Sequence, residues 1–468
     1  MSTECIQTEL DLGRSGARKL VGAFDGGAIT SNGGVALLAG ADRQLRLAER
    51  LAACFTDHRM AEAIKHTLPD LLRQRIFGLA LGYEDLIDHD ALRFDPALAA
   101  VIDKPGGALA GKSTLNRLEH ASKIGRDRHH KLDHDGAAIE RLFVDLFLEG
   151  HREPPMRIVI DLDATDDPLY GDQEGRHFHG YYDCYCYLPL YVFCGRHLLA
   201  AKLRSSANDA ADGAVQEVAR IIGHIRLHWP STTIVIRADS GFCRDDLKSW
   251  CEESGVQYVL GLASNERLAV QIEPEMKLAK RKAKRTGKPA RVFADFRYRT
   301  RKSWSVERRV IGKAEFTNGG ANPRFIVTNV HAAFGAPRFL YETVYCQRGE
   351  MENRLKECQG DLFADRTPTP TMRANQLRLW LSSLAYVLTR VVRRIGLRDS
   401  MDRMLRIVQI TKSDRTGRAG LGAGGLIFIF FDLPAVLHES PVFGGLIAMD
   451  TETALFDNPP HAHRYTGI

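Results

Sequence analysis

The sequence lacks the features that mark membrane proteins and secreted proteins. Its N-terminus, MSTECIQTEL, has no apolar signal core. Its longest apolar stretch, residues 421–436, contains Asp432 and Pro434 and is too short to span a bilayer. Its nine cysteines follow no regular spacing, which argues against a disulfide framework. We therefore expect reduced thiols and an intracellular, cytoplasmic protein.

The composition also lacks any strong bias. Hydrophobic residues make up 44% and charged residues 26% of the chain, which excludes global disorder. The net charge of +6 permits a polyanionic partner but does not by itself require one. A chain of 468 residues is too long for one core, so we expect two or three domains.

The most informative stretch is MRIVIDLDAT, residues 156–165. Its β-branched run follows two prolines and predicts a buried strand. Asp161 and Asp163 occupy alternate positions, so both side chains share one face of that strand. Paired carboxylates at the end of a buried strand are costly unless metal or phosphate chemistry uses them. In the simpler alternative, one Asp caps a turn and the other is solvated.

The chain after this strand predicts a mixed α/β sheet. Aromatic and β-branched residues predict a second strand at 181–195 and a third at 196–205, and helical spacing follows at 208–228. The next strand, 233–238, also ends in a carboxylate, Asp239. Three strands before the first long helix suit the ribonuclease H-like fold, in which an Asp on strand one meets an Asp at the end of strand four.

The region before residue 154 is predicted to be mostly helical. Apolar spacing predicts helices at 35–54 and 68–81, and a capped helix starting at Ser113-Thr114. Basic residues cluster soon after, and we interpret them either as a DNA contact or as a solvated helical face; they are Arg117, Lys123, Arg126, Arg128, His129, His130 and Lys131. A metal site built from the nearby histidines is disfavoured, because cysteine partners and a helical His-Glu pattern are missing.

A basic segment at 276–309 predicts nucleic-acid contact. It contains only Asp295 and Glu307 as acids, and its second half interleaves Tyr298 and Trp304 with basic residues in what we expect to be exposed strands. A solvated surface is the alternative. The candidate DNA-binding residues here are Lys280, Arg281, Lys282, Lys284, Arg285, Arg299 and Arg301.

The stretch YCQRGEMENRLKE, residues 345–357, predicts a helix after strands at 325–330 and 339–345. On that helix Tyr345, Arg348, Glu352 and Lys356 share one face. Ordinary surface ion pairs are the alternative. A long helix follows at 372–395, with a buried stripe expected at Leu377, Leu381, Leu384, Leu388 and Val391.

Taken together, these motifs resemble the DDE transposases of bacterial insertion sequences. The segments Asp163-Ala-Thr and RADSGF, which contains Asp239, carry the likeness, together with FDGGAITSNGG, STLNRLEH and HGYYDCYCYLPLYVF. Tyr345, Arg348 and Glu352 match the Tyr-x2-Arg-x3-Glu signature of the group that includes the insertion sequence 1380 family. The lysine expected seven residues after the Glu is replaced by Gln359, and Lys356 lies one turn after Glu352.

The resemblance implies an enzyme that binds element ends in double-stranded DNA, cleaves phosphodiester bonds and transfers strands. It implies two Mg²⁺ ions, replaceable by Mn²⁺, held by Asp163, Asp239 and Glu352 as the catalytic residues, and DNA contacts from Tyr345, Arg348 and Lys356. It also implies a homodimer on DNA, near the bacterial nucleoid. We expect a helical DNA-binding region at 1–153, a core at 154–265 and 336–398, a basic β-rich insertion at 266–335, and a divergent tail at 399–468.

Two alternatives remain open. The pattern Asp161-x-Asp163-x-Thr is also the nucleophile motif of haloacid dehalogenase-like phosphatases, but that fold leaves the basic segment and the Tyr-Arg-Glu helix unexplained. The other alternative is a catalytically inactive DNA-binding relic. The tail favours it, because Gly-rich sequence stands where a basic helical stretch is expected.

Overall fold

The computed structural model describes residues 9–15, 18–23, 30–104, 107–120 and 131–396. None of the helices within these ranges is long and apolar enough to cross a membrane. Lys123, Arg126, Arg128, His129 and His130 of the predicted basic cluster, and the tail from residue 397, lie outside the described residues.

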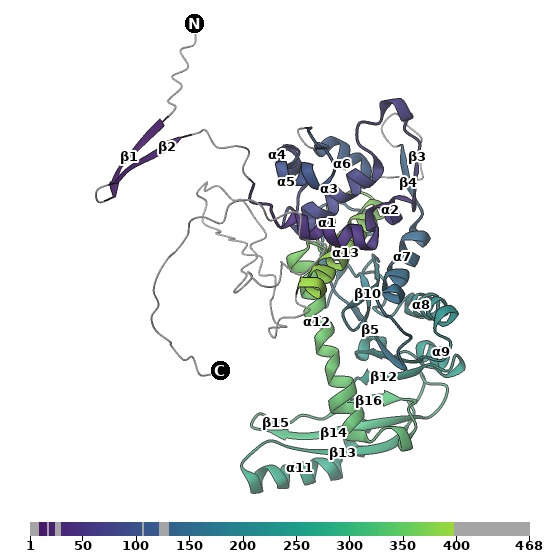
Figure 1. Ribbon diagram of the computed structural model, residues 1–468. Helices are drawn as coiled ribbons and strands as arrows, with labels where there is room; N and C mark the ends of the chain where they lie inside the picture. Colours follow the sequence, from purple (N-terminus) through teal and green to yellow (C-terminus); the bar gives the residue numbers. More distant parts are fainter. Residues whose placement is uncertain (1–8, 16–17, 24–29, 105–106, 121–130, 397–468) are drawn as a thin grey trace.

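The region before the central sheet is mostly helical and forms the upper part of the molecule in Figure 1. Its longer helices are α1 (Val35–Leu45), α2 (Leu47–Ala52), α3 (Leu68–Ala80), α6 (Lys112–Glu119) and α7 (Gly136–Glu149), with short helices α4 (His89–Leu92) and α5 (Pro96–Val101). Antiparallel pairs join β1 (Glu9–Ser15) to β2 (Arg18–Ala23) and β3 (Phe55–Asp57) to β4 (Leu132–His134). The helix predicted at 68–81 is confirmed, and Thr67 and Asp70 form its capping box.

A mixed sheet of nine strands runs through the molecule in the order β10-β9-β5-β11-β12-β16-β14-β13, with β15 paired to β14. Only the β5–β11 and β11–β12 pairs are parallel. The strands are β5 (Arg157–Ala164), β9 (Leu190–Cys194), β10 (His197–Lys202), β11 (Thr233–Ala238), β12 (Gln257–Leu262), β13 (Ala290–Tyr298), β14 (Arg308–Thr317), β15 (Gly320–Ala321) and β16 (Arg324–Thr328). The predicted mixed sheet is thus confirmed.

The alternation predicted for β5 is confirmed by its packing. Ile160 and Leu162 lie in a core cluster with α8 (Ala214–His228) and α9 (Asp245–Glu253). Val159 packs on the opposite face, in a separate cluster that includes Val344. Asp161 and Asp163 therefore lie on the same face as Val159.

The single strand predicted at 181–195 is wrong, because two strands occupy that stretch. β8 (Cys184–Tyr187) pairs with β6 (Asp167–Pro168) and β7 (His177–His179) in a separate three-stranded sheet, and β9 joins the main sheet. Pro189 lies between β8 and β9 and has no N–H to continue a ladder.

Two predicted helix starts are also wrong. Helix α6 begins at Lys112 after Gly111, without a side-chain cap, so Ser113-Thr114 lies inside the first turn. Helix α8 begins at Ala214 instead of residue 208, because Gly213 adopts a left-handed conformation with φ of 72°.

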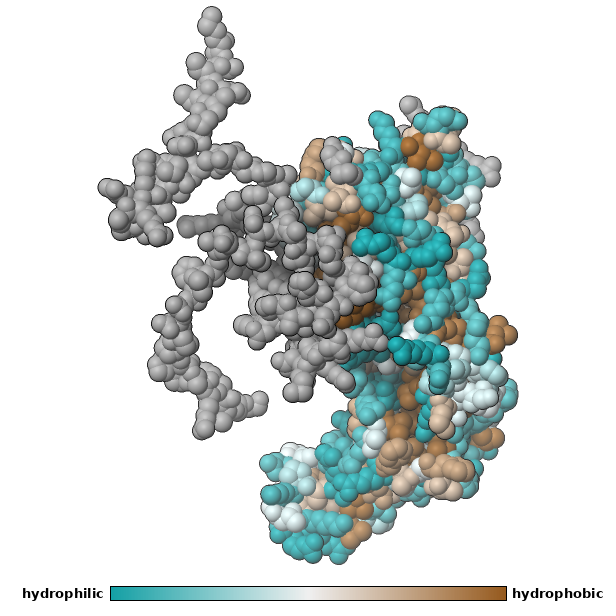
Figure 2. All heavy atoms as spheres, in the orientation of Figure 1, coloured by the Kyte–Doolittle hydropathy of each residue, from teal (hydrophilic) through white to brown (hydrophobic). Residues whose placement is uncertain are grey.

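The basic segment forms α11 (Glu273–Thr286), which follows the short α10 (Glu266–Gln271), together with β13 and β14. These elements project at the lower end of Figure 1, and hydrophilic residues cover much of that end in Figure 2. The prediction that Tyr298 and Trp304 are exposed is wrong: each is 4% exposed, and their rings meet edge to face at 5.7 Å. The buried Lys248 ammonium lies 3.5 Å from the centre of the Trp304 ring, which covers it from solvent.

The chain after β16 is helical throughout the stretch that carries the Tyr-Arg-Glu motif. The strand predicted at 339–345 is wrong, since Phe339–Tyr345 (η5) forms a π-helix. It runs through Cys346–Arg348 (η6) into α12 (Gly349–Lys356) and then Glu357–Asp361 (η7). Leu340, Tyr341 and Val344 are buried against the sheet, and a short run of apolar residues does not by itself distinguish a strand from a helix.

Helix α13 (Met372–Gly396) confirms the long helix predicted at 372–395. All five residues of its predicted stripe are buried. The helix packs against α3, α1 and α6 on one side and β10 on another, so it joins the helical region to the sheet (Figure 1).

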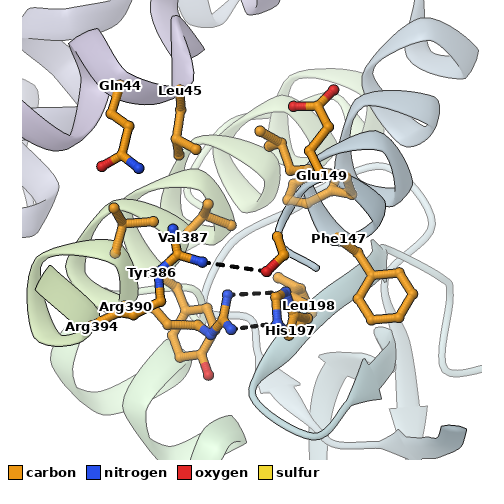
Figure 3. A pocket seen from close by; sticks show the side chains of 14 residues that line it. Gln44, Leu45, Phe147, Glu149, His197, Leu198, Tyr386, Val387, Arg390 and Arg394 are labelled. Carbon is orange, nitrogen blue, oxygen red and sulfur yellow. Dashed lines mark hydrogen bonds between the residues drawn. The ribbon is translucent and has the colours of Figure 1, made fainter. Parts of the chain in front are cut away.

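A cavity of about 150 Å³ lies where α13 meets α1, α7 and β10 (Figure 3). Arg390 donates a hydrogen bond to His197, and Arg394 donates one to the Gly150 carbonyl at 3.5 Å. Burial, and then the neighbouring Arg390 cation, lower the pKa of His197 to about 2, so this ring is neutral. None of the residues that line the cavity is among the predicted site residues.

A buried ion triad also joins the helical region to α13. Glu119 accepts hydrogen bonds from Arg75 Nε at 2.7 Å and from Arg378 at 2.6 Å. Arg75 and Glu119 are each 1% exposed. Burial opposes ionisation of Glu119, but the two guanidinium groups outweigh it and lower the pKa of its carboxyl.

We predict that Glu119→Leu lowers the free energy of unfolding by about 3–5 kcal/mol, because it leaves two buried cations without a partner. The measurement is urea denaturation. Glu149→Leu is the control: its carboxylate pairs with Arg50 at an exposed position, and such pairs contribute about 0–1 kcal/mol. Equal losses from both variants would contradict the role given to the triad.

Candidate active site

Asp163 and Asp239 lie at the same edge of the sheet because β5 and β11 are parallel and in register. The last paired residues are Leu162 and Ala238. One residue further along each strand, the chain reaches Asp163 and Asp239. The carboxyl ends of parallel strands meet at one edge, so the two carboxylates converge there.

The Asp163 carboxyl is largely buried, with 13% of its side chain exposed. Its pKa is raised to about 6, chiefly by burial and also by the negative charges of Asp239 and Glu352, while the Arg348 guanidinium opposes the rise. The Asp239 carboxylate accepts a hydrogen bond at 2.8 Å from the Gly241 backbone N–H, which fixes the turn after β11.

Arg348 joins two of the three predicted acids. It donates to Asp163 Oδ2 at 3.2 Å and, one helical turn away, to Glu352 Oε1 at 2.9 Å. The predicted shared face of Arg348 and Glu352 is thereby confirmed. The carboxylates raise the pKa of Arg348 despite its burial, so it remains a cation.

Tyr345 lies against the strand next to Asp239. A Cβ at Gly261 of β12 would lie only 2.5 Å from the Tyr345 hydroxyl oxygen and 2.9 Å from the Ser240 backbone nitrogen. Burial raises the pKa of Tyr345, with Asp239 adding to it and Arg348 opposing it. Gly261 therefore provides the space in which the tyrosine ring reaches the site.

Asp161 has a different environment from Asp163. It is buried and forms a two-pronged ion pair with Arg237, whose Nη2 donates to Asp161 Oδ2 at 2.8 Å. Arg237 also donates to the Val344 carbonyl, at the end of η5. Both oxygens of Asp161 are therefore engaged, and the pair fixes the motif helix to the sheet.

Lys356 and Gln359 lie after Glu352 on the same continuous helical segment. Lys356 is exposed. The Gln359 side chain donates to the Asp166 carbonyl at 3.0 Å and accepts from Thr165 at 3.4 Å, so it contacts the loop that follows Asp163. The position where the resemblance expects a lysine is thus adjacent to the site.

The basic residues of α11 that are predicted to contact DNA lie on the projecting end of the molecule (Figure 1). Those on α11 are exposed, and so are Arg299 and Arg301. Arg299 uses Nε to hydrogen-bond the Trp304 carbonyl at 3.1 Å. The structure does not bring these residues together with the three carboxylates.

Within the described ranges, no three His, Cys, Asp or Glu side chains are gathered tightly enough to hold a metal ion. At the candidate site, Arg348 binds both Asp163 and Glu352. The disfavoured histidine cluster is used structurally where it is described: Asp133 pairs with Arg373, and Asp135 caps α7.

The family sequence model described as "Transposase DDE domain group 1" matches residues 13–411. The chain belongs to this transposase family. The comparison with curated proteins found no match. The match spans the helical region, the whole described sheet and the motif helix, so it includes every candidate acid.

Three residues of the site had no role in the sequence analysis. Arg237 precedes Asp239 by two residues, so alternation along the strand places it on the same face as Asp239, and a basic residue there was a usable signal. Gly261 interrupts the apolar strand β12, which indicates a close approach by another group. Nothing in the sequence pointed to a role for Gln359 at the site except its position relative to Glu352.

We predict that Asp163→Asn is more stable than the parent protein above pH 6, by about 2 kcal/mol in metal-free buffer. The folded-state pKa of about 6 exceeds the ordinary value of an aspartate. The contribution of Asp163 to the free energy of unfolding is therefore greatest at low pH and is lost as the pH rises through 6. The difference should vanish near pH 4. Urea denaturation across this range, with the exposed Asp172→Asn as control, checks it; a pH-independent difference would contradict it.

We predict that Gly261→Ala lowers the free energy of unfolding by about 1–3 kcal/mol. Adding Tyr345→Phe should recover part of the loss, because it removes the nearest clashing atom but leaves the contact with Ser240. A double-mutant cycle measures this coupling. Gly223→Ala, in α8 with open space around it, is the control and should not destabilise. Strictly additive effects would show that Tyr345 does not fill this space.

Proposed function

We propose that this transposase binds the ends of its element, cleaves phosphodiester bonds there and transfers the cut strands to target DNA. The observation that carries the proposal is the arrangement around Arg348. Asp163 and Asp239 leave neighbouring parallel strands side by side, and Arg348 links Asp163 to Glu352.

Asp163, Asp239 and Glu352 are the proposed catalytic residues and the ligands of two Mg²⁺ ions, which Mn²⁺ can replace. Carboxylate oxygens suit these ions. The pKa of Asp163 is raised first by burial and then by the negative charges of Asp239 and Glu352, so a bound cation would favour its ionised form. When bound, two such ions activate the attacking oxygen and stabilise the leaving oxygen. To join the aspartates, Glu352 must leave Arg348, and its side chain is half exposed and free to turn.

Arg348 neutralises the clustered acids before DNA arrives. Once Glu352 is released, the Arg348 guanidinium is available to a DNA phosphate, for which its planar donors are well suited. Tyr345 is proposed to position the turn that holds Asp239, and exposed Lys356 to contact the DNA backbone.

We also propose that the catalytic core is ribonuclease H-like. The order β10-β9-β5-β11-β12 supports this, with the acid-bearing β5 at the centre of an antiparallel meander and parallel strands. The proposed domains are 1–153, a core at 154–265 and 336–398, the insertion 266–335, and the tail 399–468. The insertion sequence 1380 likeness, with its Tyr-Arg-Glu signature, is part of this proposal.

The proposed partners are the element's terminal repeats and target DNA, bound by a homodimer in the bacterial cytoplasm. The exposed cations of α11 and those after β13 are proposed to contact phosphates; they are Lys280, Arg281, Lys282, Lys284, Arg285, Arg299 and Arg301. Such contacts predict binding that weakens steeply with salt.

The phosphatase alternative requires Asp161 as a free nucleophile. Both of its oxygens are engaged by buried Arg237, which disfavours attack on a phosphate. The catalytically inactive relic remains an outcome of the experiment below.

We predict Mg²⁺- or Mn²⁺-dependent nicking of a labelled duplex carrying the element's own ends. Asp163→Asn, Asp239→Asn and Glu352→Gln should each reduce it by at least about 100-fold, because each removes a proposed ligand. Glu350→Gln, on the same helix but exposed, is the matched control and should retain activity. Denaturing gel electrophoresis of the cleaved strand measures the rate.

Three outcomes separate the alternatives. End binding without nicking in any metal would favour the relic. Hydrolysis of a small phosphate ester without DNA nicking would favour the phosphatase. Retained nicking in Asp163→Ala with loss in Asp161→Ala, despite intact folding, would show that the wrong aspartate was assigned.

A further inference from the structure

The cavity shown in Figure 3 lies where α13 meets α1, α7 and β10, and most of its lining is apolar. Part of the lining is fully buried; these residues are Phe143, Leu146, Leu198, Tyr386 and Val391. Another part is exposed, namely Gln44, Glu149 and Arg394, so the cavity can be reached from solvent. A concave, apolar space with a few polar groups is the usual form of a small-molecule site.

The volume of the cavity limits the size of a ligand. Its volume is about 150 Å³, which is well below the roughly 300–1,000 Å³ of sites that bury drug-sized molecules. In another protein, a cavity of about 150 Å³ with apolar walls binds benzene. The space here therefore accommodates one ring or a short branched chain.

Arg390 places a cation at this cavity that no described carboxylate balances. Its guanidinium donates to the ring nitrogens of His197, and these are its only partners among the residues that the structure describes. A neutral imidazole accepts at one nitrogen only, whereas a guanidinium carries five N–H groups. Most of the Arg390 donors therefore lack an acceptor in the described protein, and their side chain lines the cavity.

The other charged residues of the lining do not compensate the Arg390 charge. Arg394, one turn further along α13, adds a second cation and donates to the Gly150 carbonyl at 3.5 Å. Glu149 is the only carboxylate in the lining, and both its oxygens already accept from Arg50, at 2.7 and 2.8 Å. Burial lowers the pKa of Arg390 to about 10, so it remains a cation at neutral pH. A partly buried cation without a counter-ion is unfavourable, and an anionic ligand relieves that cost.

We propose that this cavity binds a small carboxylic acid in its ionised form, with the carboxylate on the Arg390 guanidinium and an apolar body of about the size of a benzene ring in the cavity. A carboxylate matches the paired N–H groups of a guanidinium, which makes this contact specific as well as strong. A phosphate ion is disfavoured, because it would leave the apolar lining without a partner. The site lies outside the proposed catalytic centre, and the inference does not depend on the proposed function.

A ligand in this cavity would contact elements of both the helical region and the sheet. Among the lining residues, Leu45 belongs to α1, Phe147 to α7, Leu198 to β10 and Val387 to α13. A ligand that binds only the folded arrangement raises the apparent stability as its concentration exceeds the dissociation constant. Binding should therefore stabilise the junction between the two parts of the molecule.

The test uses sodium benzoate as the probe and the full chain in metal-free buffer. A ligand-observed NMR titration should give a dissociation constant of about 1 mM or below, and excess benzoate should raise the melting temperature. Benzamide keeps the ring and loses the charge, and inorganic phosphate keeps a charge and lacks the ring. Each should bind at least about tenfold more weakly than benzoate.

Substitutions locate the site. Arg390→Met removes the charge and should weaken benzoate binding by about tenfold or more, because hydrogen bonds to a charged group are lost. Leu45→Phe enlarges a lining side chain and should weaken binding by reducing the free volume. Arg393→Met is the matched control and should bind like the parent: Arg393 is on the same helix but pairs with Glu357 at 2.7 Å and does not line the cavity. Thermal melts without ligand show whether each variant folds, and if Arg390→Met does not, Leu45→Phe and the benzamide comparison decide.

The contrary outcomes overturn the inference. No benzoate binding by the parent protein would do so directly. Equal affinity for benzamide would show that no cation recognises the ligand, and equal affinity for phosphate would indicate a site for anions in general. Benzoate binding that folded Arg390→Met or Leu45→Phe retains would lie elsewhere on the protein. Metal-dependent nicking is measured separately, so the proposed function stands or fails independently of these results.

Discussion

The parallel pairing of β5 with β11 is the constraint on which the candidate site depends. Its register ends at Leu162 and Ala238, so the next residue of each strand is an aspartate. Such an edge gathers negative charge in a partly buried place, which is unfavourable without compensation. The chain supplies that compensation with two arginines, one from β11 itself and one from the motif helix.

The two arginines act at different depths. Arg237 is buried with Asp161 and binds the Val344 carbonyl, so it fixes the helical segment to the sheet. Arg348 lies closer to solvent and holds Asp163 and Glu352, both of which the proposed chemistry needs. Two carboxylates only two residues apart are thus separated into a structural role and a proposed catalytic one by the cation that each meets.

The sequence predicted those features that depend on local periodicity. The alternation along β5, the buried stripe of α13 and the one-turn spacing of Arg348 and Glu352 follow from 2.0- and 3.6-residue periods, and all are confirmed. The failures depend on distant partners. Trp304 was predicted to be exposed, but its ring packs on Lys248 of α9. Phe339–Tyr345 was predicted as a strand because a short apolar run does not distinguish a strand from a helix. Likewise, strand alternation does not distinguish Asp161 from Asp163, since their structural difference lies in Arg237 on another strand; the choice of Asp163 came only from the resemblance of Asp163-Ala-Thr.

Gln359 occupies the position at which the resemblance to the insertion sequence 1380 group expects a lysine. Its amide both donates and accepts, so one side chain binds the Asp166 carbonyl and the Thr165 hydroxyl. A lysine carries only donors and cannot accept from Thr165. The glutamine therefore fixes the loop that follows Asp163, without adding charge. The proposed DNA contact by a cation then falls to Lys356, which is exposed one turn earlier on the same helical segment and faces solvent rather than the site.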